Sequence, residues 1–179
     1  MSDDEVDGDN LDDFEVIACP KEVPVACSDG YLVISYHDFV PPVEFPDIWR
    51  YTNVNELKIF TNFLSETVPD RLSTLSSLKK LVLSCSASQQ GKGISYLPYN
   101  FGNLPNLTSL DLCGNQFRDF PSCICNLKKL KKLYLNGCGV TSIPSSIASL
   151  ENLEELDLSS NALTILPEEL FSLANIEIL

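Results

Sequence analysis

The amino-acid sequence predicts an α/β protein of one architecture: a right-handed solenoid with a parallel β-sheet on its concave side and short helical or irregular segments on its convex side. Three observations predict it. A pattern of apolar residues recurs every 23 residues in the second half of the chain. Each period opens with apolar residues in alternation, as a strand with one buried face requires. Each period then continues with a proline and two apolar residues three apart, which suits a short helical return.

Three consecutive units carry the pattern without interruption. They begin at Leu107, Leu130 and Leu153, and each follows Leu-x-x-Leu-x-Leu-x-x-Asn/Cys-x-apolar-x-x-apolar-Pro-x-x-Ile/Leu-x-x-Leu. The same offsets in three adjacent units do not arise by chance, so each unit is interpreted as one structural repeat. Because no single coil can bury its own leucines, the coils must stack, each against its neighbours.

The pattern extends in both directions with decreasing fidelity. Upstream units begin near residues 78, 54 and 29, and a partial unit occupies 176–179. The unit that begins at Leu78 is longer, with about six additional residues around 87–93. We expect these residues to form a loop on the rim that is available for recognition. The repeat domain therefore spans 29–179.

One polar slot in each unit has a structural explanation. It holds Asn115, Cys138 and Asn161, each of which follows the turn at the end of a predicted strand. An inward side chain at this place can bond the backbone of neighbouring coils, which would otherwise be buried without partners. The slot is therefore predicted to be part of the framework rather than of a site.

These residues match the leucine-rich-repeat consensus, and the resemblance covers 54–179, or 29–179 with the degenerate first unit. The 23-residue form resembles most closely the intracellular repeats of Ras-interacting scaffold, Scribble/Erbin-type and plant Ras-group proteins. The resemblance implies a horseshoe that presents its concave sheet to a protein ligand, with a small GTPase or a phosphatase as the partner class. It does not name the ligand, because one fold carries many functions.

The ends of the chain have different compositions. Eight of the 25 acidic residues lie within the first 15 positions, which hold no Lys or Arg, so most of the net charge of −13 belongs to this end. We expect residues 1–13 to be a disordered acidic tail: a solubilising leader is favoured over a docking arm for a basic partner. Residues 14–28 alternate in hydropathy and are predicted to form an N-terminal cap.

The C-terminal end shows no candidate cap. Ending at Leu179 would leave the apolar face of the coil that begins at Leu153 open, and terminal coils need caps. We therefore expect the chain to be a fragment or one segment of a longer protein.

The N-terminus does not resemble a secretory signal, and no apolar run approaches the ~18 residues that span a membrane. The seven cysteines are odd in number and unevenly spread. Reduced thiols in a cytoplasmic protein are therefore predicted, with the nucleus as an alternative and no membrane partner. A cap closed by a Cys19–Cys27 disulfide is the less favoured reading.

Candidate chemistry is sparse. Any triad would depend on His37, the only histidine, which falls in the polar slot of the degenerate first unit. Gly91-Lys92-Gly93 lacks the flanking residues of a phosphate-binding loop. Cys123 and Cys125 flank the inward Ile124 and are expected to point away from the core, without the second pair that a zinc site prefers. The sequence therefore predicts no enzyme activity, no metal and no cofactor.

A lysine tract at Lys128, Lys129, Lys131 and Lys132 suggests nucleic-acid binding, but the repeat predicts otherwise. The positions 23 residues after Lys128, Lys131 and Lys132 are all glutamates: Glu151, Glu154 and Glu155. Equivalent positions on stacked coils lie about 5 Å apart, so the charges should pair and cancel. Lys79 and Lys80 have no such obvious partner. No nucleic-acid partner is predicted.

The concave face is the predicted binding surface, because residues between and beside the inward leucines point outward. Its candidate contact residues are Lys58, Phe60, Val82, Ser84, Asp111, Cys113, Tyr134, Asn136, Asp157 and Ser159. A third row, just before these, is Glu56, Lys80, Ser109, Lys132 and Glu155. Tyr134 is the candidate anchor, since tyrosine buries a large area at low entropic cost.

Two functions follow. The first is a protein-interaction scaffold or adaptor that binds a protein on its concave face, in intracellular signalling. The alternative is the recognition segment of a larger enzyme or receptor whose catalytic domain lies beyond residue 179. An autonomous enzyme ranks third, because it would require His37 or the cysteines to act.

Overall fold

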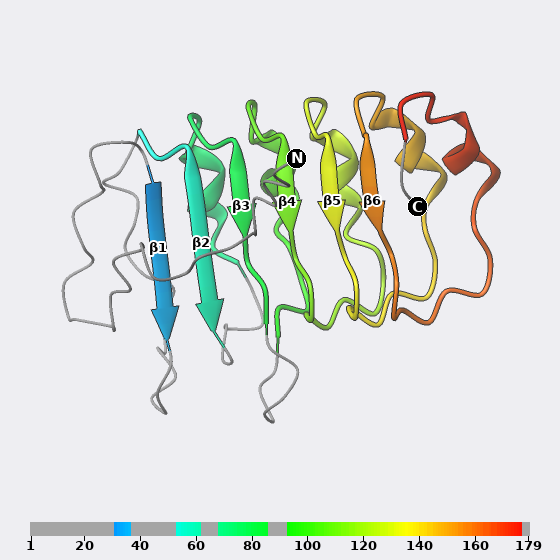
Figure 1. The fold of residues 1–179 in the computed structure, drawn as a ribbon, viewed down its shortest axis with the longest axis horizontal. Coiled ribbons are helices and arrows are strands. Elements are labelled where there is room, and N and C mark those ends of the chain that lie inside the picture. Colours follow the sequence, from blue (N-terminus) through cyan, green and yellow to red (C-terminus); the bar gives the residue numbers. More distant parts are fainter. Residues whose placement is uncertain (1–30, 37–52, 62–67, 86–92, 177–179) are drawn as a thin grey trace, which may run out of the picture.

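The computed structural model describes residues 31–36, 53–61, 68–85 and 93–176. Its strands are β1 (Tyr31–Tyr36), β2 (Glu56–Thr61), β3 (Lys80–Val82), β4 (Ser109–Asp111), β5 (Lys132–Tyr134) and β6 (Glu155–Asp157). They alternate with the 3₁₀ helices η2 (Asp70–Thr74), η3 (Tyr99–Asn103), η4 (Ser122–Asn126), η5 (Ser145–Ser149) and η6 (Glu168–Ser172). These strands pair in parallel and in chain order into one sheet (Figure 1).

The strand register is the one that the repeat predicts. The leucine in the strand of each unit faces its equivalent on the next strand. These strand leucines are at most 1% exposed: Leu57, Leu81, Leu110, Leu133 and Leu156. At the N-terminal edge β1 pairs with β2, with Leu32 opposite Leu57. The predicted α/β solenoid with a parallel sheet is therefore confirmed.

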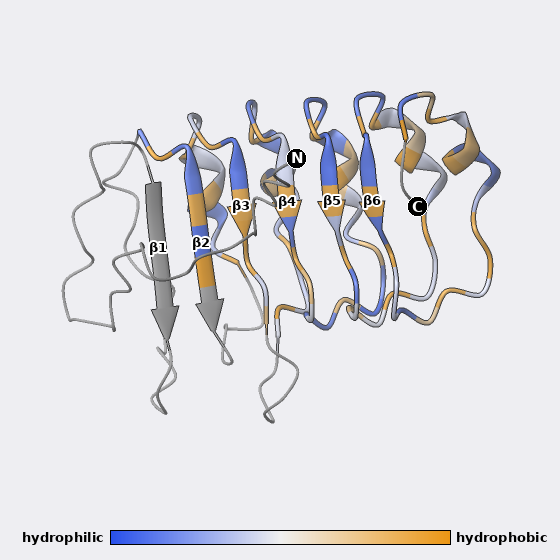
Figure 2. Cartoon of the chain, viewed as in Figure 1, coloured by the Kyte–Doolittle hydropathy of each residue, from blue (hydrophilic) through white to orange (hydrophobic). Residues whose placement is uncertain are grey.

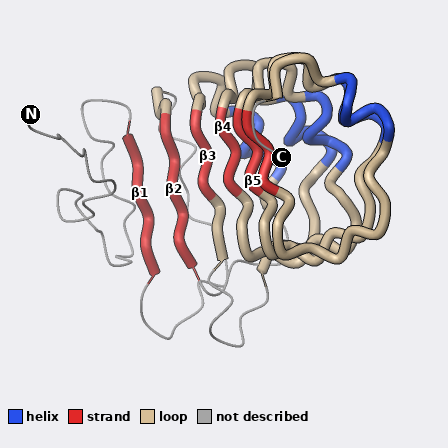
Figure 3. Tube along the Cα trace, turned by 45° about the vertical axis from the view of Figure 1, so that its right-hand side comes forward, coloured by secondary structure: helices blue, strands red, loops and turns tan. Residues whose placement is uncertain are grey.

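A proline starts each helical return. Pro69, Pro98, Pro121, Pro144 and Pro167 precede the five 3₁₀ helices with φ between −62° and −75°, the angle that the pyrrolidine ring imposes. Each helix lasts five residues and ends at a leucine whose backbone N–H bonds the carbonyl three residues earlier. The helices lie on the side of the stack opposite the strands (Figure 3).

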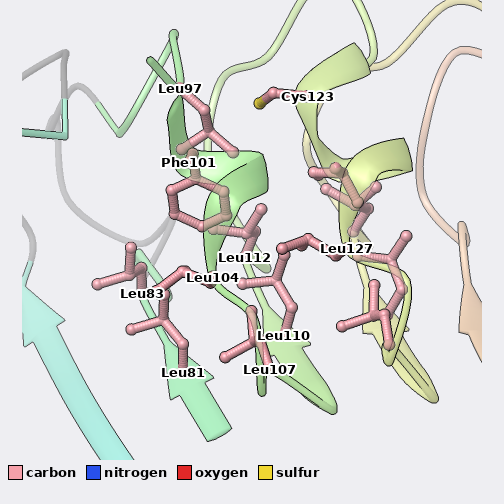
Figure 4. Close-up of a cluster of buried hydrophobic side chains, with 14 of the residues drawn as sticks. Leu81, Leu83, Leu97, Phe101, Leu104, Leu107, Leu110, Leu112, Cys123 and Leu127 are labelled. Carbon is pink, nitrogen blue, oxygen red and sulfur yellow. The ribbon is translucent and has the colours of Figure 1, made fainter. Parts of the chain in front are cut away.

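Between sheet and helices runs one continuous apolar core. It extends from Val54 to Leu173 and consists mainly of the leucines of the repeat. Figure 4 shows the part of this core around Leu81, Phe101 and Leu110. In β4 and β6 a hydrophobic leucine lies between two hydrophilic residues, as a sheet with one buried face requires (Figure 2). In the last described coil, Leu158, Leu163 and Leu166 are only partly buried. Their equivalents one coil earlier are at most 7% exposed: Leu135, Val140 and Ile143.

The polar slot works as predicted. Asn115 is 2% exposed, and its side-chain amide donates to the carbonyl oxygens of Leu83 and Leu112, both at 2.7 Å, while its oxygen accepts from the backbone N–H of Ile94 at 2.9 Å. Asn161 makes the same kind of contacts two coils later. Cys138 donates its S–H to the Leu112 carbonyl at 3.1 Å. Each slot residue bonds its own coil and the preceding one, so the series links the coils that begin at 78, 107, 130 and 153.

A second asparagine series escaped the sequence analysis. Asn106, Asn152 and Asn175 stand at the turn before the strands, and each side-chain amide bonds a carbonyl of the preceding coil at 2.7–2.9 Å. Lys129 fills the remaining position of this 23-residue series and donates to the side-chain oxygen of Asn106 at 2.7 Å. The spacing was visible in the sequence, but it lies outside the leucine pattern.

The expectation that Cys123 and Cys125 point away from the core is wrong. They are 8% and 3% exposed. Residues on the flanks of a 3₁₀ helix face the helices of the neighbouring coils, so stacking covers them. Ser146 on η5 donates to the Cys125 sulfur at 3.3 Å, which places this flank between two coils.

Several predicted features lie outside the described residues: the acidic tail 1–13, the cap 14–28, His37, most of the additional residues around 87–93, and the end of the partial unit 176–179. The domain boundaries and the continuation of the chain stay predictions. Within the described ranges, no helix has the length and apolar character needed to cross a membrane.

Candidate functional site

The outward positions of β2 to β6 form rows across the sheet, which we call the sheet face. The first row is Glu56, Lys80, Ser109, Lys132 and Glu155, and the second is Lys58, Val82, Asp111, Tyr134 and Asp157. The third row follows the second along each strand by two residues: Phe60, Ser84, Cys113, Asn136 and Ser159. The side chain of Phe60 lies outside the described part. Phe60 apart, the predicted residues therefore share one surface, with the exception of Val82.

Val82 lies in the second row but is only 6% exposed, so it offers a partner almost no surface. In register it stands between Lys58 and Asp111. The longer Lys58 side chain flanks the short branched one, and cross-strand neighbours of this kind lie within contact distance. Val82 is therefore removed from the predicted contact set.

Ion pairs between neighbouring coils occupy the first row. Lys132 on β5 pairs with Glu155 on β6 at 2.6 Å, and Lys80 on β3 pairs with Glu56 on β2 at 3.0 Å. Bonding to Glu155 raises the pKa of Lys132, and the same bond lowers the pKa of Glu155. The prediction for Lys132 is confirmed. The expectation that Lys80 has no obvious partner is wrong, because the ion pairs of this row also include Glu56 on β2.

The remainder of the lysine tract is only partly as predicted. Lys131 pairs with Glu154 at 2.5 Å, as expected. Lys128 does not reach Glu151: its ammonium donates instead to the carbonyl oxygens of Cys125 and Ser149, both at 3.3 Å. These carbonyls belong to the last turns of η4 and η5, where unpaired carbonyls attract a cation. Lys131 and Lys132 are thus paired with carboxylates, whereas Lys128 donates to neutral backbone carbonyls.

Tyr134 stands in the middle of the charged part of this surface. Its hydroxyl donates to a carboxylate oxygen of Glu155 on the next strand, the same residue that pairs with Lys132. Asp111 and Asp157 occupy the equivalent positions on β4 and β6. Burial raises the pKa of Tyr134 to about 12, with further contributions from the bond to Glu155 and the charge of Asp111. The ring is therefore held in one orientation among carboxylates.

The shift of Tyr134 predicts a pH dependence of stability. Its pKa rises from the ordinary 10.0 to about 12, so the neutral phenol is favoured in the folded chain. The stabilisation is complete below pH 10 and is lost as the pH rises through 12, because the unfolded chain releases this proton first. Urea unfolding across this range should show a shallower loss of stability for Tyr134→Phe than for the wild type. Equal slopes in both proteins would contradict the assignment.

Burial raises the pKa of every cysteine in the described ranges. Burial raises the pKa of the Cys113 thiol, and the hydrogen bond with Asp111 raises it further. Burial also raises the pKa of Cys123 and of Cys138, each to about 11. A thiol must ionise to attack, so the raised pKa values favour the less reactive thiol form of these cysteines near neutral pH. In the ranges that the structure describes, no group of three His, Cys, Asp or Glu side chains could hold a metal ion.

A second surface feature lies away from the sheet face. A groove of about 970 Å³ spans three coils on the flank of the stack. Tyr96 and Tyr99 border it and are 57% and 78% exposed. Sequence analysis missed this groove, because the tyrosines belong to the long unit, whose shape the 23-residue pattern does not specify.

Comparison with known proteins agrees with this geometry. The sequence profile of the family described as "Leucine-rich repeat region" matches residues 57–179. No curated protein sequence matches the chain significantly. Leucine-rich-repeat regions generally mediate protein–protein interaction and are typically non-enzymatic binding modules.

Among solved structures, a leucine-rich-repeat protein of Leptospira interrogans is 27% identical with a TM-score of 0.61, and an internalin of Listeria monocytogenes is 27% identical with a TM-score of 0.66. The matches cover 83% of this chain and 42% and 40% of those chains. The ectodomain of an Arabidopsis thaliana membrane receptor kinase, in complex with Casparian strip integrity factor 2, shares the fold at 21% identity (TM-score 0.54, 83% of this chain, 20% of that chain). The matched region thus covers less than half of each of these proteins.

Proposed function

Because the chain belongs to the leucine-rich-repeat family, we propose that it is a protein-binding module that holds a protein ligand on its sheet face. One observation supports this surface above the others. In the second row, Asp111, Tyr134 and Asp157 present two carboxylates and an aromatic ring side by side on three adjacent strands. Solenoid sheets of this kind form extended binding surfaces, and a tyrosine that is already oriented costs little entropy to bury.

In the leading version of the proposal the chain acts as an intracellular scaffold or adaptor in signalling. A small GTPase or a phosphatase as partner, and a cytoplasmic location, rest on the resemblance of the 23-residue repeat alone. The second version is the recognition segment of a larger enzyme or receptor. The receptor-kinase ectodomain with the same fold is a precedent for this version. Both versions use the same face, so one experiment tests their common part.

The sheet-face assignment predicts a specific effect of Tyr134→Ala. Peptides would be selected from a random display library with the wild-type chain as bait, and their affinities would be measured by fluorescence anisotropy. We expect Tyr134→Ala to weaken the binding of the selected peptides by about tenfold, the loss of roughly 1.4 kcal/mol that a moderate anchor gives.

Tyr99→Ala is the matched control, since Tyr99 is an exposed tyrosine that lies on the flank, away from the sheet face. Its affinity should stay within about twofold of the wild type, below the threshold of a meaningful contact. If Tyr99→Ala lowers the affinity and Tyr134→Ala does not, the ligand uses the flank and the proposal for the sheet face is wrong.

A further inference from the structure

On the described part of the sheet face, the lysines of the first row have partners of opposite charge, but two aspartates of the second row do not. In the first row Lys132 and Lys80 are both paired, with Glu155 and Glu56. In the second row, Asp111 and Asp157 each accept one backbone N–H, from Cys113 and from Ser159, both at 2.9 Å. Among the described residues neither carboxylate has a cation within 4.0 Å. Lys80 and Lys132 are thus paired with glutamates, whereas within the described residues these two aspartates keep an uncompensated negative charge.

The two aspartates flank one aromatic ring. Asp111, Tyr134 and Asp157 lie in register on β4, β5 and β6. Adjacent strands lie about 4.8 Å apart, so the aspartates stand about 10 Å apart with the tyrosine between them. The negative charge of Asp111 contributes to the raised pKa of Tyr134, so the two side chains interact electrostatically. The hydroxyl is already bonded to Glu155, so the ring offers a partner its face rather than its hydroxyl.

We propose that the sheet face binds a basic protein segment through an arginine side chain placed against Tyr134, between Asp111 and Asp157. This inference rests on the proposed function, because it names the ligand class of the same surface. A guanidinium stacks on an aromatic face and donates N–H bonds in its own plane toward carboxylates on either side. A lysine ammonium is a more strongly hydrated point charge with fewer donors, so arginine is preferred. An acidic or phosphate-bearing partner is disfavoured by the same two carboxylates.

The first test uses a minimal probe. N-acetyl-arginine methylamide is titrated into the ¹⁵N-labelled full chain, with the neutral citrulline analogue as the matched probe. We expect the arginine probe to shift the amide signals of Asp111, Tyr134 and Asp157 in a saturable manner, and the citrulline probe to leave them unchanged. The shifts should vanish in Asp111→Asn/Asp157→Asn. Asparagine keeps the side-chain oxygen that accepts from Cys113 and Ser159, so this variant should stay folded.

A control variant with the same change in charge excludes general attraction to an acidic protein. Asp119→Asn/Glu151→Gln removes two negative charges from exposed positions outside the sheet face. We expect this control to bind the arginine probe as the wild type does. Equal weakening in both double variants, or shifts spread over all acidic surfaces, would overturn the proposed arginine site. Absence of any shift at β4, β5 and β6 would overturn it as well.

The second test separates this inference from the proposed function. Peptides selected on the wild-type chain that depend on Tyr134 should carry an arginine whose replacement by citrulline weakens binding about tenfold. The same replacement should have little effect on Asp111→Asn/Asp157→Asn, because the two changes remove one interaction. Peptides that depend on Tyr134 but contain no basic residue would overturn the arginine inference and leave the proposed function intact. Peptides that do not depend on Tyr134 would overturn both.

Discussion

Gly114→Ala is expected to lower the free energy of unfolding by about 3–4 kcal/mol, among the largest effects of a single substitution. Gly114 has φ +72°, a left-handed conformation that costs other residues about 1–2 kcal/mol. An added Cβ would also lie 2.0 Å from the carbonyl oxygen of Cys85 in the preceding coil. Backbone cannot yield as a flexible side chain can, so the two coils would have to separate. Urea unfolding followed by circular dichroism measures the loss.

Gly139→Ala separates the two contributions. Its φ is +71°, almost that of Gly114, but a Cβ at this position meets nothing within 4 Å. We expect this variant to lose only the conformational cost, about 1 kcal/mol. Equal losses in the two variants would mean that the close approach to Cys85 does not limit the stacking of these coils.

The sheet could be predicted to the residue, because its register is a consequence of the period. Stacking equivalent residues of 23-residue coils places Leu110, Leu133 and Leu156 opposite one another, whatever the remaining side chains do. The 29-residue unit follows the same rule, because its strand leucine, Leu81, faces Leu110 despite the different spacing. The additional residues fall between elements and do not disturb the pairing.

The errors concern side chains rather than backbone. The period predicts which Cα atoms are neighbours, but not where a long side chain ends. Lys128 and Lys131 have equivalent glutamates in the next coil, yet only Lys131 reaches its glutamate, because Lys128 lies beside helix-terminal carbonyls. The burial of Cys123 and Cys125 depends on the 3₁₀ form of the return, whose flanks contact both neighbouring coils. A pattern of apolar residues does not specify that form.

The candidate site was predictable as a surface but not as an arrangement. The sequence places Asp111, Tyr134 and Asp157 in one row, and the structure agrees. The bond between Tyr134 and Glu155, and the contrast between paired lysines and unpaired aspartates, depend on side-chain geometry across neighbouring strands. The charge preference of the face therefore became visible only with the structure.

Asn115→Ala tests how far the framework depends on its buried polar slot. The substitution leaves the carbonyl of Leu83 and the N–H of Ile94 without their partner in the core, whereas the carbonyl of Leu112 still accepts the S–H of Cys138. Each buried group that loses its hydrogen bond costs about 1–3 kcal/mol, so for the two groups we expect a total loss of about 2–6 kcal/mol in the free energy of unfolding. Asn115→Cys should lose less, because Cys138 fills the equivalent slot and donates to a carbonyl, but Ile94 would still lack an acceptor.

Asn106→Ala is the matched control for this prediction. Asn106 belongs to the second asparagine series, is half-buried, and donates to one carbonyl, that of Ser76 at 2.9 Å. Water can reach this turn and replace the lost donor, so we expect a loss of about 1 kcal/mol or less. The ratio between the two losses is the informative quantity. If Asn115→Ala cost no more than Asn106→Ala, the inner slot would be a minor contact, and leucine packing alone would hold the two coils in register.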